Sequence, residues 1–192
     1  TRKESSAASD VYKRQLQRSE FVISNQEKKQ IKENFFQLTN FTRFTDSMPM
    51  AITLDRNNIV ELNPDEYKSS INIRKEYSVT EKTDGERNVL FINSKGDMYL
   101  ANRQNEIKKL GVNSLTCRNT LIDGEFVNQN LNGTPIRLFL AFDIYFSNGN
   151  DLRENILMRS SKDIQDGEYD TSRLEELEEV IQKLDLVKDD AE

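Results

Sequence analysis

The sequence predicts an α+β domain, built on an antiparallel or mixed sheet with flanking helices. Strand-forming residues concentrate between positions 77 and 146, where apolar runs are separated by short polar turns. Helical periodicity is confined to segments on either side of that block. Turns containing Gly96 and Gly133 join consecutive apolar runs directly, which favours antiparallel pairing of the strands.

Capping boxes mark two of the predicted helices. Ser24 and Glu27 have the spacing of a capping box, and apolar residues follow at i, i+4 and i+7, so we predict an amphipathic helix over residues 25–38. A second box begins at Ser172 and predicts a helix whose apolar face carries Leu174, Leu177, Ile181 and Leu184. A further helix is predicted over residues 151–164.

The strands are predicted from apolar alternation between turn residues. We expect a short strand over residues 51–54, followed by strands over 77–82, 87–93, 98–102, 120–128 and 136–146. The last of these is a nearly unbroken apolar run, so it is predicted to be a central strand covered on both faces.

Composition and charge exclude several functions. The net charge of −6 argues against a domain that coats DNA without specificity, although a local basic cleft remains compatible with it. No apolar run approaches the roughly 20 residues of a membrane span, and no secretory signal is visible. The single cysteine, Cys117, cannot form an internal disulfide, which favours an intracellular protein.

The chain contains no histidine, and this removes many catalytic arrangements. Ser-His-Asp and Cys-His nucleophiles cannot be built, nor can a histidine-ligated zinc site. A bound metal would need oxygen ligands, which favours Mg²⁺ or Mn²⁺. A phosphate-binding P-loop motif is also missing.

The most informative segment is the hexapeptide KTDGER at residues 82–87. An Asp-Gly turn between two predicted strands would place the amine of Lys82 and the guanidinium of Arg87 on one rim of the sheet. A lysine amine with a depressed pKa can attack phosphorus, while an arginine holds phosphate or ribose oxygens. Taken alone, the segment also fits an exposed lysine at a strand end and an ordinary turn.

Three further segments follow in order: YLANR at 99–103, LIDGEFV at 121–127 and FLAFDI at 139–144. Together the four segments resemble the motifs of the covalent nucleotidyltransferases, which comprise mRNA capping guanylyltransferases and ATP-dependent DNA and RNA ligases. The resemblance spans about residues 77–150. The small residue Thr83 and the LIDGEFV segment are most similar to capping enzymes, especially those of large DNA viruses.

The resemblance implies a two-step reaction on GTP. Lys82 would attack the α-phosphate and expel pyrophosphate, and the resulting lysyl-N–GMP would pass its GMP to the 5′ diphosphate end of RNA. The unperturbed pKa of lysine is about 10.4, so almost none of the amine is nucleophilic at neutral pH. We expect Arg87, Arg103 and a divalent cation to lower this pKa.

The resemblance also suggests roles for residues that would bind the nucleotide. Thr83 is expected beside it, while Arg87 and Arg103 suit ribose and phosphate oxygens because a guanidinium forms a planar fork. Arg103 could instead belong to an exposed loop. Phe142 is expected to stack on the purine, although Phe142 and Phe139 could both be core residues.

Two carboxylates are expected to bind the metal, Mg²⁺ or Mn²⁺. Glu125 could coordinate the ion or accept a ribose hydroxyl, and Asp123 two residues earlier would share its face of the strand. Asp143 lies in the most apolar run, where a charge needs a partner or a metal. Asp143 is therefore a site carboxylate, as we favour, or a member of a core ion pair. The triplet at residues 166–168 has no flanking strand and is predicted to be a turn.

The organisation of the chain is predicted from its residue patterns and, for the last segment, from the same resemblance. We expect a disordered or non-native leader at 1–20, a helix and connecting segment at 21–70, and a partial nucleotidyltransferase domain at 71–192. Nothing after residue 151 matches motifs IV and V or the OB-fold domain of the family, so we expect this chain alone to be inactive or impaired.

The expected partners are GTP and the 5′ end of RNA. The resemblance to viral enzymes further suggests fusion to RNA triphosphatase and methyltransferase domains and, for a virus, the host cytoplasm. Two alternatives remain: the adenylation domain of an ATP-dependent ligase, and a noncatalytic nucleotide-binding remnant.

Overall fold

A computed structural model describes residues 21–61, 63, 65, 71–74, 77–167 and 169–188. The chain divides into two compact units: Thr1–Met48 together with Asp84–Glu192, and Pro49–Thr83. The predicted leader at 1–20 lies outside the described residues. The predicted boundary at residues 70–71 remains a prediction.

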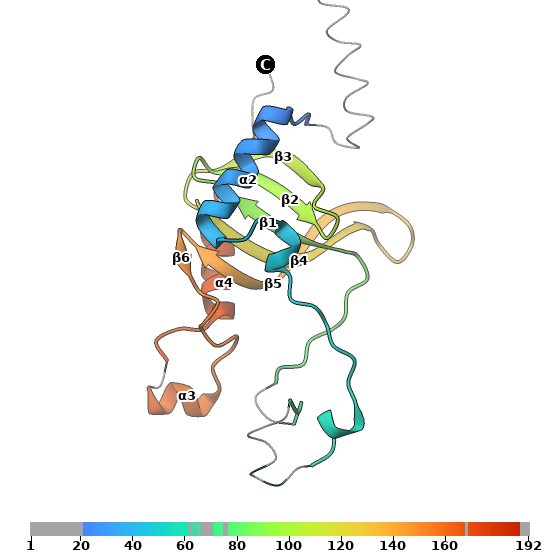
Figure 1. Ribbon diagram of the computed structural model, residues 1–192, viewed down its shortest axis with the longest axis vertical. Coiled ribbons are helices and arrows are strands. Elements are labelled where there is room, and N and C mark those ends of the chain that lie inside the picture. Colours follow the sequence, from blue (N-terminus) through green and yellow to red (C-terminus); the bar gives the residue numbers. More distant parts are fainter. Residues whose placement is uncertain are drawn as a thin grey trace, which may run out of the picture. The chain divides into compact units, whose positions relative to one another are not determined.

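The first unit is built on one antiparallel sheet, which confirms the α+β fold class (Figure 1). In the described part of the chain the sheet has seven strands in the order β6-β5-β4-β1-β2-β3-β7. Their bounds are β1 Glu86–Ile92, β2 Asp97–Asn102, β3 Ile107–Ser114, β4 Thr120–Gln129, β5 Pro135–Ser147, β6 Asn150–Asp151 and β7 Leu186–Lys188.

Helices α2 (Asn25–Thr39) and α4 (Arg173–Lys183) cover opposite faces of the sheet (Figure 1). The faces are separated by alternation along each strand. Val89 and Phe91 of β1 join the core cluster under α2, while Leu90 and Ile92 join the cluster under α4. The apolar run of β1 is therefore buried on both sides, which explains why it is not interrupted by polar residues.

Both predicted capping residues start their helices. The Ser24 hydroxyl accepts a hydrogen bond from the Glu27 backbone N–H at 3.1 Å. Ser172 and Glu175 form a reciprocal capping box at the start of α4. The predicted apolar face of α4 is confirmed for Leu174, Leu177 and Leu184, which pack in one core cluster. It is wrong at Ile181, which is 50% exposed, while Val180 is buried instead.

The strands predicted over 51–54 and 77–82 are wrong. In the second unit, the described residues contain one helical turn, η2 (Arg56–Asn58), and otherwise irregular backbone. Tyr77 and Val79 are 55% and 98% exposed, so their alternation reflects no buried face. Strand propensity expresses packing on a half-buried sheet surface, and without that surface it does not suffice.

The predicted central position of the strand at 136–146 is also wrong. The observed β5 lies between β4 and the short edge strand β6, which pairs only with Phe146 and Ser147. Of its 13 residues, only the last four are buried. The apolar run therefore does not indicate burial on both faces along its whole length.

Three further elements differ from the predictions. The segment at 151–164 is not one helix: Asp151 ends β6, and a helix, α3 (Ser161–Asp166), forms only after an irregular stretch. Gly167 ends α3 in the left-handed conformation (φ 63°), so the predicted turn at this triplet is confirmed there. Strands β3 and β7 were not predicted, because two lysines and Gly111 interrupt the apolar pattern of β3.

Among the described residues, no helix has the length and apolarity needed to cross a bilayer.

Candidate functional site

An ion pair between strands β1 and β4 forms the centre of the candidate site. Arg87 donates from Nη2 to Asp123 Oδ2 at 2.5 Å and from Nε to Oδ1 at 3.1 Å. The Asp123 side chain is fully buried, whereas the Arg87 side chain is 21% exposed. The hydrogen bonds to Asp123 raise the pKa of Arg87. Arg87 thus stays charged, with one side anchored in the sheet.

Two residues of β5 complete the surroundings of this ion pair. The Tyr145 hydroxyl donates to Asp123 Oδ2 at 2.6 Å. Burial, followed by the charge of Asp123, raises the pKa of Tyr145, so the phenol remains a neutral donor. The ring centroid of Phe142 lies 5.7 Å from Arg87 Cζ, within the range of a cation–π contact, and the ring is 39% exposed.

Glu125 anchors the Asp-Gly turn that precedes β1. Its Oε1 accepts the Gly85 backbone N–H at 3.1 Å. A Cβ atom at Gly85 would lie 2.7 Å from both Glu125 Cγ and the Phe126 carbonyl oxygen, so only glycine lets the turn approach β4 this closely. Because Arg87 is the register partner of Glu125, the carboxylate and the guanidinium lie near each other on neighbouring strands.

Arg103 lies in the turn between β2 and β3, at the same end of the sheet as the first residues of β1. The register places Asn88 beside Asn102, and the Asn102 Oδ1 organises the turn by accepting the N–H groups of Gln104 and Glu106 at 3.1 and 3.0 Å. The Arg103 side chain is exposed. The fold therefore brings Arg87, Glu125, Phe142 and the Arg103 turn to one region of the sheet.

Asp143, by contrast, is bound to α4. Arg173 donates from Nε to Asp143 Oδ1 at 2.8 Å and from Nη2 to Oδ2 at 3.1 Å. The two side chains are 14% and 17% exposed, so this is the core ion pair that the sequence left open. Both Asp143 oxygens are therefore engaged by Arg173.

The carboxylates of this region do not by themselves form a metal site. In the described ranges no group of three or more Asp, Glu or Cys side chains is arranged to hold an ion. Glu125 contacts the Gly85 N–H, and Asp143 is neutralised by an arginine. The metal-binding roles of Glu125 and Asp143 toward Mg²⁺ or Mn²⁺ remain predictions, because such an ion can be held by one or two carboxylates together with substrate phosphates.

Lys82 and Thr83 are the last two residues of the second unit, Pro49–Thr83. Their backbone is irregular, and the Lys82 side chain is exposed. The chain passes from Thr83 directly into the Asp84-Gly85 turn and then into β1. Their roles remain predictions, as do those of Arg87, Arg103, Glu125 and Phe142.

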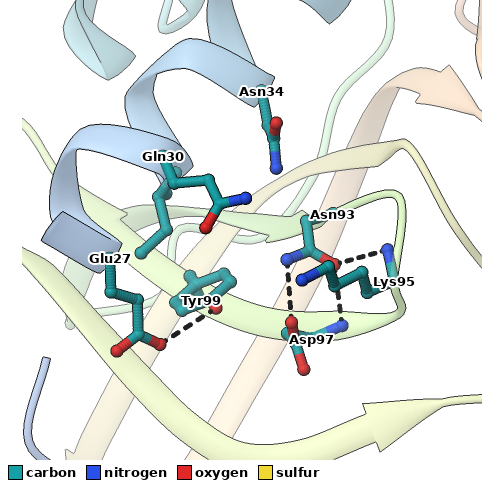
Figure 2. A pocket seen from close by; sticks show the side chains of 8 residues that line it. Glu27, Gln30, Asn34, Asn93, Lys95, Asp97 and Tyr99 are labelled. Carbon is teal, nitrogen blue, oxygen red and sulfur yellow. Dashed lines mark hydrogen bonds between the residues drawn. The ribbon is translucent and has the colours of Figure 1, made fainter.

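A separate pocket of about 200 Å³ lies between α2 and the β1–β2 hairpin (Figure 2). Asn93 holds the hairpin, donating from Nδ2 to Asp97 Oδ2 at 2.9 Å and accepting the Lys95 N–H at 2.8 Å. Tyr99 donates to Glu27 Oε1 at 3.4 Å (Figure 2). None of the predicted site residues lines this pocket, and the Asn93 and Asp97 side chains in it hold the hairpin.

Tyr145 was not among the predicted site residues, and Asp123 was considered only as a neighbour of Glu125. The signal in the sequence was weak but physical. Asp123 follows Leu121 and Ile122, and Tyr145 lies in an apolar run, so each places a polar atom where burial requires a partner. Which group would satisfy them depends on the strand order, which the sequence does not state.

Comparisons with known proteins agree with the motif analysis. Residues 18–183 match the protein family described as mRNA capping enzyme, catalytic domain. Over 140 residues the chain is 34% identical to a probable mRNA-capping enzyme of Acanthamoeba polyphaga mimivirus. This match covers 72% of the chain but 11% of the viral protein, so the chain spans about a tenth of that relative's length.

A solved structure of a mycobacterial DNA ligase D complexed with ATP and MES is also similar. It shares 18% sequence identity, with a TM-score of 0.35, and the match covers 55% of this chain and 38% of the ligase chain.

Proposed function

Since this chain belongs to the family of mRNA capping enzyme catalytic domains, we propose that it carries out mRNA guanylyl transfer through a covalent lysyl-N–GMP intermediate on Lys82. The observation that carries this proposal is the anchored guanidinium of Arg87, which begins the strand directly after the KTDGER turn. Lys82 lies five positions before Arg87 in sequence, so their Cα atoms are at most about 18 Å apart. This covalent limit is compatible with one nucleoside triphosphate contacting both side chains.

The proposed reaction proceeds in two balanced steps. The unprotonated Nζ of Lys82 attacks the α-phosphorus of GTP, the bond from that phosphorus to the bridging oxygen breaks, pyrophosphate leaves, and the nitrogen gives up one proton to solvent. A terminal oxygen of the 5′ diphosphate of RNA then attacks the same phosphorus, and the P–N bond breaks as the nitrogen takes up a proton from solvent, which returns the lysine amine. Both steps concentrate negative charge on phosphate oxygens, which Arg87 and Arg103 are suited to stabilise.

The remaining proposed contacts follow from exposure and position. The half-exposed ring of Phe142 offers a stacking surface for guanine, next to the guanidinium of Arg87. Glu125 is suited to a ribose hydroxyl, and Thr83 adjoins the nucleophile in sequence. A divalent cation, Mg²⁺ or Mn²⁺, would supply further charge neutralisation on the phosphates. Glu125 remains a proposed contact for it, whereas Asp143 would first have to leave Arg173.

The proposal is tested by labelling the full-length protein with GTP that carries a radioactive α-phosphate. We expect a covalent protein–GMP adduct that is chased onto RNA with a 5′ diphosphate end. Lys82→Ala and Lys82→Arg should both abolish the adduct, because neither side chain supplies a nucleophilic amine at that position. Lys95→Ala, which removes an exposed lysine of the β1–β2 hairpin, is the matched control and should label normally.

Two results would contradict the assignment. An adduct that forms with ATP but not with GTP would identify a ligase-type adenylation domain. Wild-type transfer activity in Lys82→Ala would show that this lysine is not the nucleophile. From the motif resemblance to capping enzymes of large DNA viruses, we further propose that a longer protein containing this chain would include RNA triphosphatase and methyltransferase domains and would act in the cytoplasm of an infected cell.

A further inference from the structure

We propose that Asp123 and Tyr145 are positioning residues, which fix the guanidinium of Arg87 in the orientation that contacts the nucleotide. The identity of that nucleotide as GTP rests on the proposed function. The fixed orientation of Arg87 rests on the geometry of three neighbouring strands alone.

The three side chains form a connected network across β1, β4 and β5. Asp123 accepts two hydrogen bonds from Arg87 and a third from the Tyr145 hydroxyl. Its Oδ2 is shared between Arg87 Nη2 and the phenol, at 2.5 and 2.6 Å. Because the bidentate contact involves Nε and Nη2, the plane of the guanidinium is set by the carboxylate, and Nη1 lies outside this contact.

Burial of the Asp123 carboxylate disfavours this network unless its oxygens are fully paired. The Asp123 side chain has no exposed surface, and taking a carboxylate out of water is strongly destabilising unless its oxygens are paired. Here every oxygen has a donor, and no buried side-chain N or O atom among the described residues lacks a partner. Replacing a buried ion pair by well-packed apolar residues often leaves stability unchanged or raises it, so stability alone is a weak explanation for this network, and its effect on Arg87 is a better one.

The network acts on the partly exposed end of Arg87. An arginine side chain that is mobile before binding loses rotamer freedom when it binds a ligand, and that entropy loss weakens binding. Asp123 removes the freedom in advance, and the Phe142 ring at 5.7 Å lies against the guanidinium. Arg87 is thereby held in place before the nucleotide arrives, as a group that stabilises developing phosphate charge should be.

The test measures adduct formation on the full-length protein as a function of GTP concentration. Asp123→Asn removes the charge and one acceptor oxygen, and we expect the KM for GTP to rise about tenfold, as for loss of one charge-assisted hydrogen bond. Tyr145→Phe removes only the phenol oxygen and should raise KM about threefold. Tyr99→Phe is the matched control: another buried tyrosine of the same sheet, bonded to Glu27 instead, which should leave KM unchanged.

A double-mutant cycle separates positioning from a structural role. In an Arg87→Ala background, Asp123→Asn should raise KM no further, because the residue it orients is gone. Equal increases in both backgrounds would overturn the proposal. A merely structural role would lower Tm and the fraction of active protein while leaving KM unchanged, which would also overturn it. If Asp123→Asn does not fold, the same cycle is run with Tyr145→Phe, which keeps the ion pair.

The failure of the proposed function can be told apart from the failure of this inference. If the wild-type protein forms no adduct, the function is wrong, and crystal structures of the wild type and of Asp123→Asn decide the orientation of Arg87. We expect a different Arg87 rotamer in the variant. An unchanged rotamer would show that Asp123 does not hold the guanidinium.

Discussion

Asp123 and Asp143 are register partners on β4 and β5, yet each binds an arginine from a different element. Asp123 holds Arg87 of β1, and Asp143 holds Arg173 of α4. Register shifts flank this pair of residues, and a bulge re-aims the side chains of its strand. Two carboxylates that look alike in sequence therefore serve the candidate site and the packing of a helix, respectively.

The role of Asp143 can be tested at the scale of single residues. We expect Asp143→Ala and Arg173→Ala each to lower the free energy of unfolding by about 3 kcal/mol, near the lower limit for breaking a buried pair because both side chains keep some exposure. Urea denaturation measures this, and the double variant should lose less than the sum of the two. A shift in the Mg²⁺ dependence of adduct formation in Asp143→Ala alone would instead support a metal contact.

At the scale of elements, α4 depends on its first turn. The Ser172 hydroxyl and the Glu175 carboxylate form the capping box, and Arg159 contacts Glu175 from the segment between β6 and α3, at 2.9 Å between Nε and Oε2. The hydrogen bond from Arg159, followed by those from Ser172, lowers the pKa of Glu175 to about 2. The sequence pattern that predicted the helix is thus also the one that anchors it to the loop.

These contacts predict a pH-dependent contribution to stability. Because the pKa of Glu175 is depressed in the folded state, its contribution is present above the unfolded value of about 4.3 and is lost as pH falls toward 2. The difference in Tm between wild type and Glu175→Gln should therefore be visible at pH 7 and should vanish near pH 2. A difference in Tm that persists unchanged in acid would contradict this linkage.

The helix cap gives a separate prediction. Ser172→Ala should lower the free energy of unfolding by about 1 kcal/mol, because the helix loses its N-terminal cap.

The turn before β1 gives a second prediction at this scale. In Gly85→Ala the new Cβ would meet the Phe126 carbonyl oxygen at 2.7 Å, and because a backbone atom cannot move aside, the turn must shift away from β4. We expect adduct formation to fall more than tenfold, since a displacement of about 1 Å can cost about 10²-fold. Gly133→Ala in the β4–β5 hairpin is the control, because no atom lies within 4 Å of its new Cβ. We expect this variant to lower stability through its positive φ while leaving the amount of adduct unchanged.

At the scale of the whole molecule, one sheet carries both helices and the candidate site. α2 packs on the face that holds Val89 and Phe91, and α4 on the face that holds Leu90 and Ile92. The site lies where β1 begins, beside β4 and β5, so three strands contribute to it. On β5, Leu138, Leu140 and Phe142 are 45%, 37% and 39% exposed, so this part of the strand is open at the surface.

The chain on its own should transfer GMP poorly. Within it, Arg87 and Arg103 are the proposed phosphate contacts, and no segment after residue 151 resembles the lysine-bearing motif V of the family. Losing some of the cationic groups that stabilise phosphate charge raises the activation free energy of phosphoryl transfer by several kcal/mol, which lowers the rate by orders of magnitude. Labelling the 192-residue chain beside the full-length protein measures the difference. Equal labelling would show that Arg87 and Arg103 suffice.

Local signals in the sequence determined the elements that carry strong patterns. The capping residues Ser24 and Ser172 located α2 and α4, and the Asp-Gly and Ser-Lys-Gly turns located the strands around Gly96. The KTDGER segment and the LIDGEFV strand can also be identified from sequence, because each motif is a short run of neighbouring residues. These motifs indicate the family. The predictions were wrong for strands at 51–54 and 77–82, where the apolar residues stay exposed. They were also wrong for the central position of 136–146 and for a continuous helix over 151–164.

Tertiary structure alone decided which charges share a site. Arg87 and Asp123 are 36 residues apart and meet only because β4 pairs with β1, while Asp143 is drawn to α4 by Arg173, 30 residues later. Tyr145 reaches the ion pair from a third strand. The desolvation of a buried carboxylate makes such pairing obligatory, but the choice of partner depends on strand order and bulges, which no local pattern encodes.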